Sequence, residues 1–226
     1  MGRRVRFYDL GEGPAVVLLH GFTSSFDGTW AARGWVDELL RAGRRVVGLD
    51  FPGHGASAPA ADCGPERLVE DVLAVVDELG LEAPDVAGFS MGGGVALRLA
   101  GEQPQRVSRL VVGGVGDPGI NGRHDADALA RGWERMQAAA RARGLDPAAL
   151  EPYFTGRGWP AGLDEPLPPI AAPTLLFLAE RDQYMRPSER TERWLAHALV
   201  VRSRGRDHYQ VLDDPALHDA VLAFLR

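Results

Sequence analysis

The strongest constraint on the fold is a regular alternation of short β-rich runs with longer helical patterns along the chain. Over 66–79, for example, apolar residues recur at every third or fourth position, the spacing of one helix face. Strands that alternate with helices build βαβ units, so we expect an α/β fold with a mostly parallel central sheet and helices on both faces. The expected strands are 5–8, 16–19, 45–49, 86–89, 107–113, 174–178 and 199–201, and the expected helices are 35–40, 66–79, 91–101 and 215–225.

One long interval interrupts this alternation ahead of the strand expected at 174–178. Residues 117–169 contain a helical pattern through Leu129 and Trp133, followed by a proline-rich tail. An interval of this length between two strands is more often a functional lid than a structureless loop. The length of 226 residues fits one domain, so we expect a single domain over 1–226 with a short helical lid at about 117–169.

Charge and cysteine content limit the classes of partner. The net charge of −6, without a stripe of Lys and Arg, argues against nucleic acid as a partner. Cys63 alone can build neither a disulfide framework nor a zinc site, which favours a reducing cytoplasm. The sequence shows no secretory leader and no apolar stretch near the ~20 residues of a membrane helix. We expect a cytoplasmic protein that acts on a small molecule without a membrane partner, and its oligomeric state stays open.

A short glycine-flanked motif carries the clearest chemical signal. Residues 88–92 read Gly-Phe-Ser-Met-Gly, the pattern G-x-S-x-G, directly after an expected strand and before an expected helix. This context is that of a nucleophile elbow, in which a sharp turn exposes a serine Oγ at the sheet edge. The N-terminus of the following helix adds positive potential where an oxyanion forms. A glycine-rich turn with an incidental serine is the alternative, and the flanking strand and helix favour Ser90 as the nucleophile.

Serine is a weak nucleophile without a base, and His208 is the histidine best placed to be that base. It lies after the last expected strand, and Asp182 lies just past the strand at 174–178. The chain order Ser90, Asp182, His208, with each residue at the carboxyl end of a strand, is the order of a triad on a parallel sheet. The other five histidines have structural or surface explanations: His20 bracing its loop, His54 in a turn, His124 in the lid, and His197 and His218 on helices.

Three other aspartates compete with Asp182 for the role of acid. Asp117 is the main alternative, because some proteins with this triad place the acid after the preceding strand. Asp50 ends an earlier strand and begins a turn, which favours a structural role. Asp207 is adjacent to His208 in sequence and cannot readily turn back to reach the imidazole. We therefore expect Asp182 to orient the base.

Acyl transfer also needs two hydrogen-bond donors for the developing oxyanion. The residue after the nucleophile supplies the backbone N–H of Met91. The loop after the strand at 16–19 supplies the second donor, for which we expect the backbone N–H of Phe22. The side chains of Phe22 and Met91 are equally compatible with core packing or a pocket wall, and the expected role of the two backbone groups does not depend on them.

Taken together, these motifs resemble the α/β-hydrolase superfamily along nearly the whole chain. Within it, the chain is most similar to small bacterial esterases, meta-cleavage-product carbon–carbon hydrolases and the menaquinone-pathway synthase. The resemblance implies an intact triad, while dehalogenases of this fold differ by carrying aspartate where this chain has Ser90. Nothing in the sequence calls for a cofactor or a metal, so we expect none. The matching segments are His20-Gly21-Phe22, Asp50-Phe51-Pro52-Gly53-His54-Gly55-Ala56-Ser57, Gly88-Phe89-Ser90-Met91-Gly92-Gly93, Glu180-Arg181-Asp182 and Asp207-His208.

We expect a serine hydrolase that cleaves a small ester, thioester or lactone through an acyl-enzyme on Ser90. The first alternative is a carbon–carbon bond hydrolase or lyase that uses the same triad. The second, from a different class, is a ligand-binding sensor on a hydrolase scaffold. In the lid, Trp133 and Trp159 are expected to contact substrate, and packing of the lid onto the sheet is the competing explanation for both.

Overall fold

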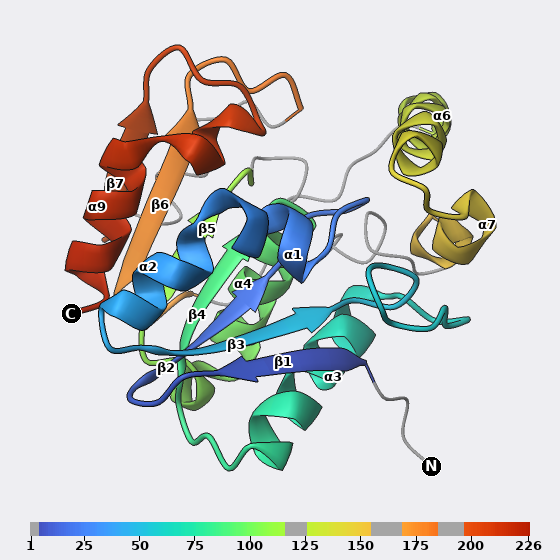
Figure 1. Cartoon of the computed structure of the whole chain (residues 1–226). Helices are drawn as coiled ribbons and strands as arrows, with labels where there is room; N and C mark the ends of the chain where they lie inside the picture. The colour runs from blue at the N-terminus through green and yellow to red at the C-terminus, as the bar shows by residue number, and fades with distance from the viewer. Residues whose placement is uncertain (1–4, 116–125, 155–168, 185–196) are drawn as a thin grey trace.

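The computed structural model describes residues 5–115, 126–154, 169–184 and 197–226 (Figure 1). The strands are β1 (Arg6–Leu10), β2 (Ala15–Leu19), β3 (Arg45–Asp50), β4 (Asp85–Phe89), β5 (Leu110–Gly113), β6 (Thr174–Ala179) and β7 (Leu199–Ser203). The longer helices are α2 (Trp35–Arg41), α3 (Pro65–Glu78), α4 (Met91–Glu102), α6 (Ala126–Ala142) and α9 (Pro215–Phe224). Shorter helical segments are α1 (Phe26–Thr29), η1 (Ala31–Arg33), η2 (Pro104–Arg106), α7 (Pro147–Leu150), η3 (Glu151–Tyr153) and η5 (Gln210–Asp213).

The described strands form one sheet in the order β1-β3-β2-β4-β5-β6-β7. β1 runs antiparallel to β3 at one edge, and every other neighbouring pair is parallel. All five residues of the central strand β4 are buried, because helices cover both of its faces. The sheet confirms the expected mostly parallel α/β architecture.

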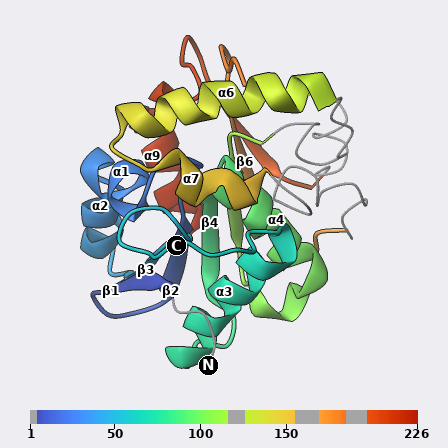
Figure 2. The ribbon, with the colours of Figure 1, turned by 90° about the vertical axis from the view of Figure 1, so that its right-hand side faces the viewer.

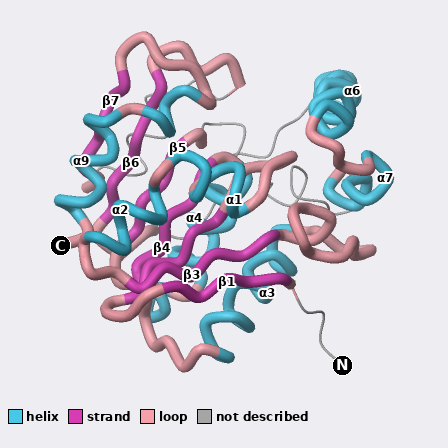
Figure 3. The backbone as a smooth tube through the Cα atoms, viewed as in Figure 1, coloured by secondary structure: helices cyan, strands magenta, loops and turns pink. Residues whose placement is uncertain are grey.

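Successive residues of β2 divide between the two faces of the sheet. Val17 and Leu19 belong to a core that α3 and α4 complete, whereas Val16 and Leu18 belong to a core that includes α2 and α9. This alternation follows from the two-residue period of a strand. Figure 3 shows the strands in magenta with helices on either side, so the helices expected on both faces are present.

The strand expected at 107–113 begins later in the structure. Residues Pro104–Arg106 form the turn η2, and the N–H of Ser108 donates to the C=O of Pro84 (3.1 Å), which brings the chain onto the sheet. β5 therefore starts at Leu110, although the side chain of Val107 is already buried. The apolar run in the sequence marks where side chains become buried. Here the buried residues begin at Val107, ahead of the first residue of the strand.

The segment expected as a lid contains α6, α7 and η3. The helical pattern predicted there is confirmed as α6, while most of the proline-rich tail lies outside the described residues. Figures 1 and 2 show α6 and α7 beyond the carboxyl ends of β2 and β3, the edge at which parallel strands present their loops. Among the described residues, no helix has the length and apolar composition that crossing a membrane requires.

Candidate active site

Ser90 lies in a strained turn between β4 and α4. Its φ and ψ are 55° and −116°, a conformation that non-glycine residues rarely adopt. The turn is held because the N–H of Ser90 donates to the C=O of Gly113 (2.8 Å). A Cβ atom at Gly92 would lie 2.3 Å from the C=O oxygen of Leu19, so only glycine allows α4 to approach β2 this closely. The spacing of the G-x-S-x-G motif follows from this close approach.

Ser90, His208 and Asp182 come together from the loops after β4, β7 and β6. Nε2 of His208 lies 3.2 Å from Oγ of Ser90, and Nδ1 of His208 lies 2.7 Å from Oδ2 of Asp182. Both members of the His–Asp pair are buried. A carboxylate can only accept, so Nδ1 donates to Asp182; in the neutral ring this leaves Nε2 free to accept from the serine hydroxyl. The structure thus brings together the three residues that the sequence singled out.

The competing aspartates are engaged elsewhere or lie outside the described residues. Asp207 caps its own loop by accepting the N–H groups of Tyr209 (2.9 Å) and Gln210 (2.8 Å). Asp50 accepts the N–H of Phe26 (2.8 Å), the structural role expected for it. Asp117 belongs to the part of the chain that is not described.

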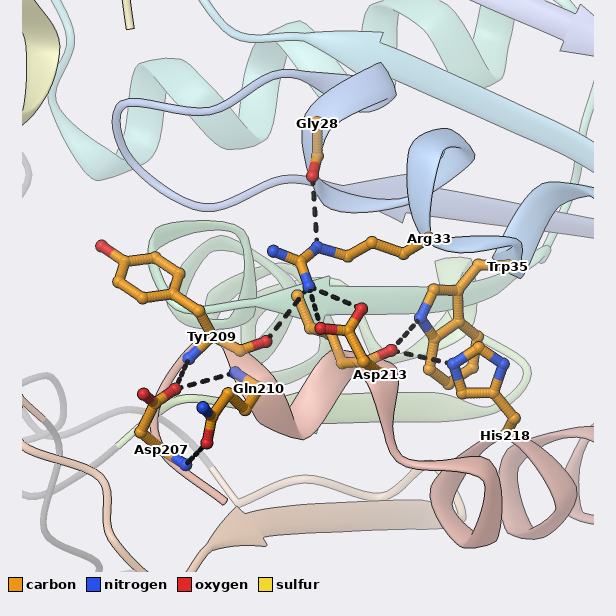
Figure 4. A network of polar contacts seen from close by, with 9 residues as sticks. Gly28, Arg33, Trp35, Asp207, Tyr209, Gln210, Asp213 and His218 are labelled. Atoms are coloured by element: carbon orange, nitrogen blue, oxygen red, sulfur yellow. Dashed lines mark hydrogen bonds and ion pairs between the residues drawn. The ribbon is translucent and has the colours of Figure 1, made fainter. Parts of the chain in front are cut away.

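A polar network ties the segment after His208 to the region between α1 and α2 (Figure 4). The Arg33 guanidinium donates to both carboxylate oxygens of Asp213 (2.7 and 2.6 Å) and to the C=O of Tyr209 (3.3 Å). The indole N–H of Trp35 donates to the C=O of Leu212 (2.9 Å). The loop that bears the base is therefore anchored to an element far from it in sequence.

Two backbone N–H groups adjoin Ser90 without an internal acceptor. Within the described part of the chain, neither Phe22 nor Met91 donates its backbone N–H to another residue. Met91 begins α4, whose first-turn N–H groups point toward the elbow. A Cβ atom at Gly21 would lie 3.3 Å from Cβ of Ser90, so the loop that bears Phe22 runs directly beside the serine. Both groups therefore lie beside Ser90, and their expected role as oxyanion donors stays a prediction.

Two fully buried histidines frame this loop. Nε2 of His20 accepts the N–H of Phe51 (2.9 Å), and Nε2 of His54 accepts the N–H of Thr23 (3.1 Å). Burial lowers the pKa of His20 to about 4, and burial with the neighbouring His20 lowers the pKa of His54 to about 3. Both rings are neutral braces of the loop rather than proton carriers.

The segment expected as a lid reaches the same loop through packed aromatic rings. The Trp133 ring packs on Phe154 (4.7 Å between centroids), and Phe154 packs on Phe22 (5.3 Å). Only the Phe154 ring therefore separates Trp133 from Phe22, whose backbone N–H is the expected oxyanion donor. Trp159 lies outside the described residues.

Sequence reasoning missed several side chains that line the triad. The rings of Tyr184 and Tyr209 both lie 5.2 Å from the His208 ring. The guanidinium of Arg143, the residue after α6, lies 5.4 Å from the Tyr209 ring. Burial and the adjacent Tyr184 raise the pKa of Tyr209. Closeness in sequence to Asp182 and His208 was the only signal for the two tyrosines, and Arg143 had none.

The described residues contain no cluster of three or more His, Cys, Asp or Glu side chains that could hold a metal ion. What the site does hold is a chain of contacts from Ser90 through His208 to Asp182. Residues 14–142, more than half of the chain, match the profile of the alpha/beta hydrolase fold. The chain belongs to the α/β-hydrolase fold family.

This α/β hydrolase is similar to curated enzymes over part or most of its length. It is 40% identical over 116 residues to the 2-hydroxymuconate semialdehyde hydrolase of Pseudomonas putida, a match that covers 50% of this chain and 40% of that protein. It is 27% identical to the sn-1-specific diacylglycerol lipase ABHD11 of Mus musculus, covering 96% of this chain and 84% of that protein. Against curated relatives at 42%, 37% and 40% identity, the chain spans only 34%, 40% and 40% of their lengths.

Solved structures extend the likeness of fold to the whole chain. The α/β hydrolase superposes with a TM-score of 0.77 on Est816, described as an N-acyl homoserine lactone degrading enzyme. The match covers 98% of this chain and 96% of that chain at 20% identity. At this level of identity the superposition speaks to the fold alone.

Proposed function

We propose that this hydrolase cleaves a small ester, thioester or lactone through an acyl-enzyme formed on Ser90. The observation that carries the proposal is the continuous contact from Ser90 Oγ through His208 to Asp182. It lies next to two backbone N–H groups that have no acceptor among the described residues. The substrate is a small molecule, and the chemistry requires no cofactor. The single cysteine of the chain favours a reducing, cytoplasmic setting.

The proposed reaction begins with proton transfer. As Oγ of Ser90 attacks the substrate carbonyl, Nε2 of His208 accepts its proton, and Asp182 stabilises the imidazolium through Nδ1. The N–H groups of Phe22 and Met91 donate to the oxyanion. His208 then protonates the leaving group, which departs and leaves an acyl-enzyme. A water molecule, deprotonated by His208, then attacks the acyl carbon. The Ser90 Oγ–acyl bond breaks, His208 returns its proton to Oγ, and the acid leaves with Ser90 and His208 restored.

Steady-state kinetics on short p-nitrophenyl esters test this proposal. Ser90→Ala should lower kcat by about 10⁴-fold or more, since it removes the attacking oxygen and little else. The exposed Ser108 provides a matched control, and Ser108→Ala should keep wild-type turnover. Absence of turnover in the wild type, on esters and thioesters of varied length, would instead support a ligand-binding sensor.

Carbon–carbon bond hydrolysis is the second candidate, favoured by the 40% identity to 2-hydroxymuconate semialdehyde hydrolase. The same triad would act on a ketone activated as a vinylogous diketone. Product analysis separates the two functions. Both release a carboxylic acid, but ester hydrolysis releases an alcohol beside it, whereas carbon–carbon hydrolysis releases an enol or ketone that leaves through carbon. A kcat/KM higher for the diketone than for any ester would assign the second function.

A further inference from the structure

The loop that bears Phe22 contains a strained turn. The N–H of Ser24 donates to the C=O of Gly21 (3.2 Å), and Thr23, the third residue of the turn, has a φ of 58°. Positive φ at the third residue alone defines a type II turn, where glycine or asparagine is usual. A β-branched residue in this conformation is an outlier that its surroundings must hold in place. The buried Oγ1 of Thr23 has no hydrogen-bond partner among the described residues, so the restraint acts through its backbone.

His54 supplies that restraint. Its Nδ1 lies 2.9 Å from the C=O of Pro52, which can only accept, so Nδ1 carries the hydrogen and Nε2 is bare. Nε2 accepts the N–H of Thr23 (3.1 Å). In a type I turn, which threonine would adopt without strain, the central peptide is turned over and this N–H points away. The hydrogen bond to His54 therefore selects the strained form of the turn.

Tyr153 joins the lid to the same structure. Its hydroxyl donates to the C=O of Pro52 (2.9 Å), so one carbonyl holds both Tyr153 and His54. Tyr153 and His54 are both fully buried, and the Phe22 ring packs edge-on against each of them, at 5.3 and 5.2 Å. A Cβ atom at Gly53 would lie 2.8 Å from the C=O oxygen of Ala149, so α7 also packs closely against the segment that contains Pro52 and His54.

We propose that His54 and Tyr153 are positioning residues for the Phe22 N–H. Tyr153 orients the Pro52 carbonyl, and this carbonyl fixes the His54 tautomer and ring. His54 then holds the Thr23 N–H, which fixes the Phe22–Thr23 peptide and, through it, the position of the backbone that carries the Phe22 N–H beside Ser90. The lid segment at 147–153 thus controls the rate of the chemical step and not only access to the site. This inference rests on the proposed acyl transfer at Ser90, for which Phe22 supplies one oxyanion donor.

The variant Tyr153→Phe tests the inference by removing one hydroxyl. Removing an oxyanion donor outright costs 10²- to 10³-fold in kcat, so a misaligned donor should cost about tenfold. KM should change less than twofold, because the donor matters chiefly in the transition state. The inhibition constant of a trifluoromethyl ketone, which forms a tetrahedral adduct with the serine, should rise by the same factor of about ten.

Two further variants separate positioning from simple stabilisation. Tyr8→Phe is the matched control, since it also deletes a tyrosine hydroxyl bond, to Asp50 (3.0 Å), at the sheet edge. It should lower the melting temperature without changing kcat or ketone affinity. In a Thr23→Gly background the turn needs no restraint against strain, so Tyr153→Phe should lower kcat less than about threefold.

The inference is overturned if Tyr153→Phe behaves like Tyr8→Phe, or if its tenfold loss persists unchanged in the Thr23→Gly background. It is also overturned if only KM rises. Failure of the proposed function looks different: wild-type protein would then show no ester turnover and no dependence on Ser90. Each result therefore addresses one claim.

Discussion

Two residues in the described chain combine positive φ with a side chain, and they are Ser90 and Thr23. One precedes the Met91 N–H, and the other follows the Phe22 N–H. Backbone strain of this kind costs about 1–3 kcal/mol per residue and persists only where the surroundings over-determine it. Its restriction to the two segments that flank the expected oxyanion donors indicates that the sheet edge is organised around those donors.

Asp182 is the residue expected to orient the imidazole of His208, and Asp117 is its main alternative. Asp182→Asn should lower kcat by about 10⁴-fold, because an asparagine side chain disturbs the imidazole tautomer that leaves Nε2 bare. Asp117→Asn is the matched control and should cost less than about tenfold. Comparing kcat of the two variants on one ester decides the point. A large loss in Asp117→Asn with little in Asp182→Asn would move the acid to the earlier strand.

The buried histidines predict a loss of stability in mild acid. The pKa values of His20 and His54 are about 4 and about 3 in the folded protein and near 6.5 when exposed, so the unfolded chain binds more protons below pH 6.5. Their contribution is fully present above pH 6.5 and is lost as the pH falls toward 4. Between pH 6.5 and 5 the free energy of unfolding should fall by about 3 kcal/mol.

Urea denaturation at several pH values measures this loss. Ordinary carboxyl groups titrate mostly below pH 5, so the window isolates the histidines. His54→Gln, which removes one titrating group, should roughly halve the slope. A stability that is flat between pH 7.5 and 5 in the wild type would show that these rings are protonated in the folded state.

Among the elements, α6 and the segment after η3 meet the sheet-edge loop after β2 through aromatic rings. Trp133 on α6, Phe154 after η3 and Phe22 after β2 form a continuous contact. The sequence predicted the helix and its apolar stripe, since both follow from local periodicity. It did not predict that the stripe leads to Phe22, because a contact between segments this far apart in the chain leaves no local pattern.

The lid prediction concerns substrate preference. Trp133→Ala should shift the ratio of kcat/KM for long over short acyl esters by about tenfold, since one lost hydrophobic contact discriminates by about 1–3 kcal/mol. Leu145→Ala, also half-buried in the lid and packed on the same core, is the control and should lower stability alone. An unchanged ester profile in Trp133→Ala would leave this residue with a packing role.

At the scale of the whole molecule, one buried ion pair joins distant parts of the chain. Arg44, before β3, pairs with the buried Asp85 of β4 and donates to the C=O of Leu225 near the end of α9. Removing one partner of such a pair leaves a buried charge uncompensated. Arg44→Ala should therefore lower the free energy of unfolding by about 3–5 kcal/mol, toward the lower end because Arg109 also lies near Asp85.

The adjacent Arg45 provides the control for that prediction. Its pair with Asp9 (2.7 Å) is partly exposed, so Arg45→Ala should cost less than about 1 kcal/mol. Urea denaturation measures both values, and kcat of the folded fraction should match wild type in each. An equal fall in the free energy of unfolding in the two variants would contradict the expected difference between the buried and the partly exposed pair.

The sequence predicted the parallel sheet and the three residues that meet at Ser90, but not the framework that holds them. Period and motif are local signals, and the strand ends of a parallel sheet converge by geometry, so Ser90, Asp182 and His208 could be named. The Arg33–Asp213 pair and the Tyr153–Pro52 bond join segments 180 and 101 residues apart. Such partners are set by tertiary packing, which one sequence does not encode in any local spacing.

Covalent labelling tests the assignment of Ser90 as the nucleophile without any assumption about the substrate. A fluorophosphonate probe reacts with a serine activated by its base, and the modified peptide can be located by tandem mass spectrometry. We expect one probe mass on Ser90 in the wild type and none in Ser90→Ala. A label on another residue, or equal labelling of folded Ser90→Ala, would contradict it.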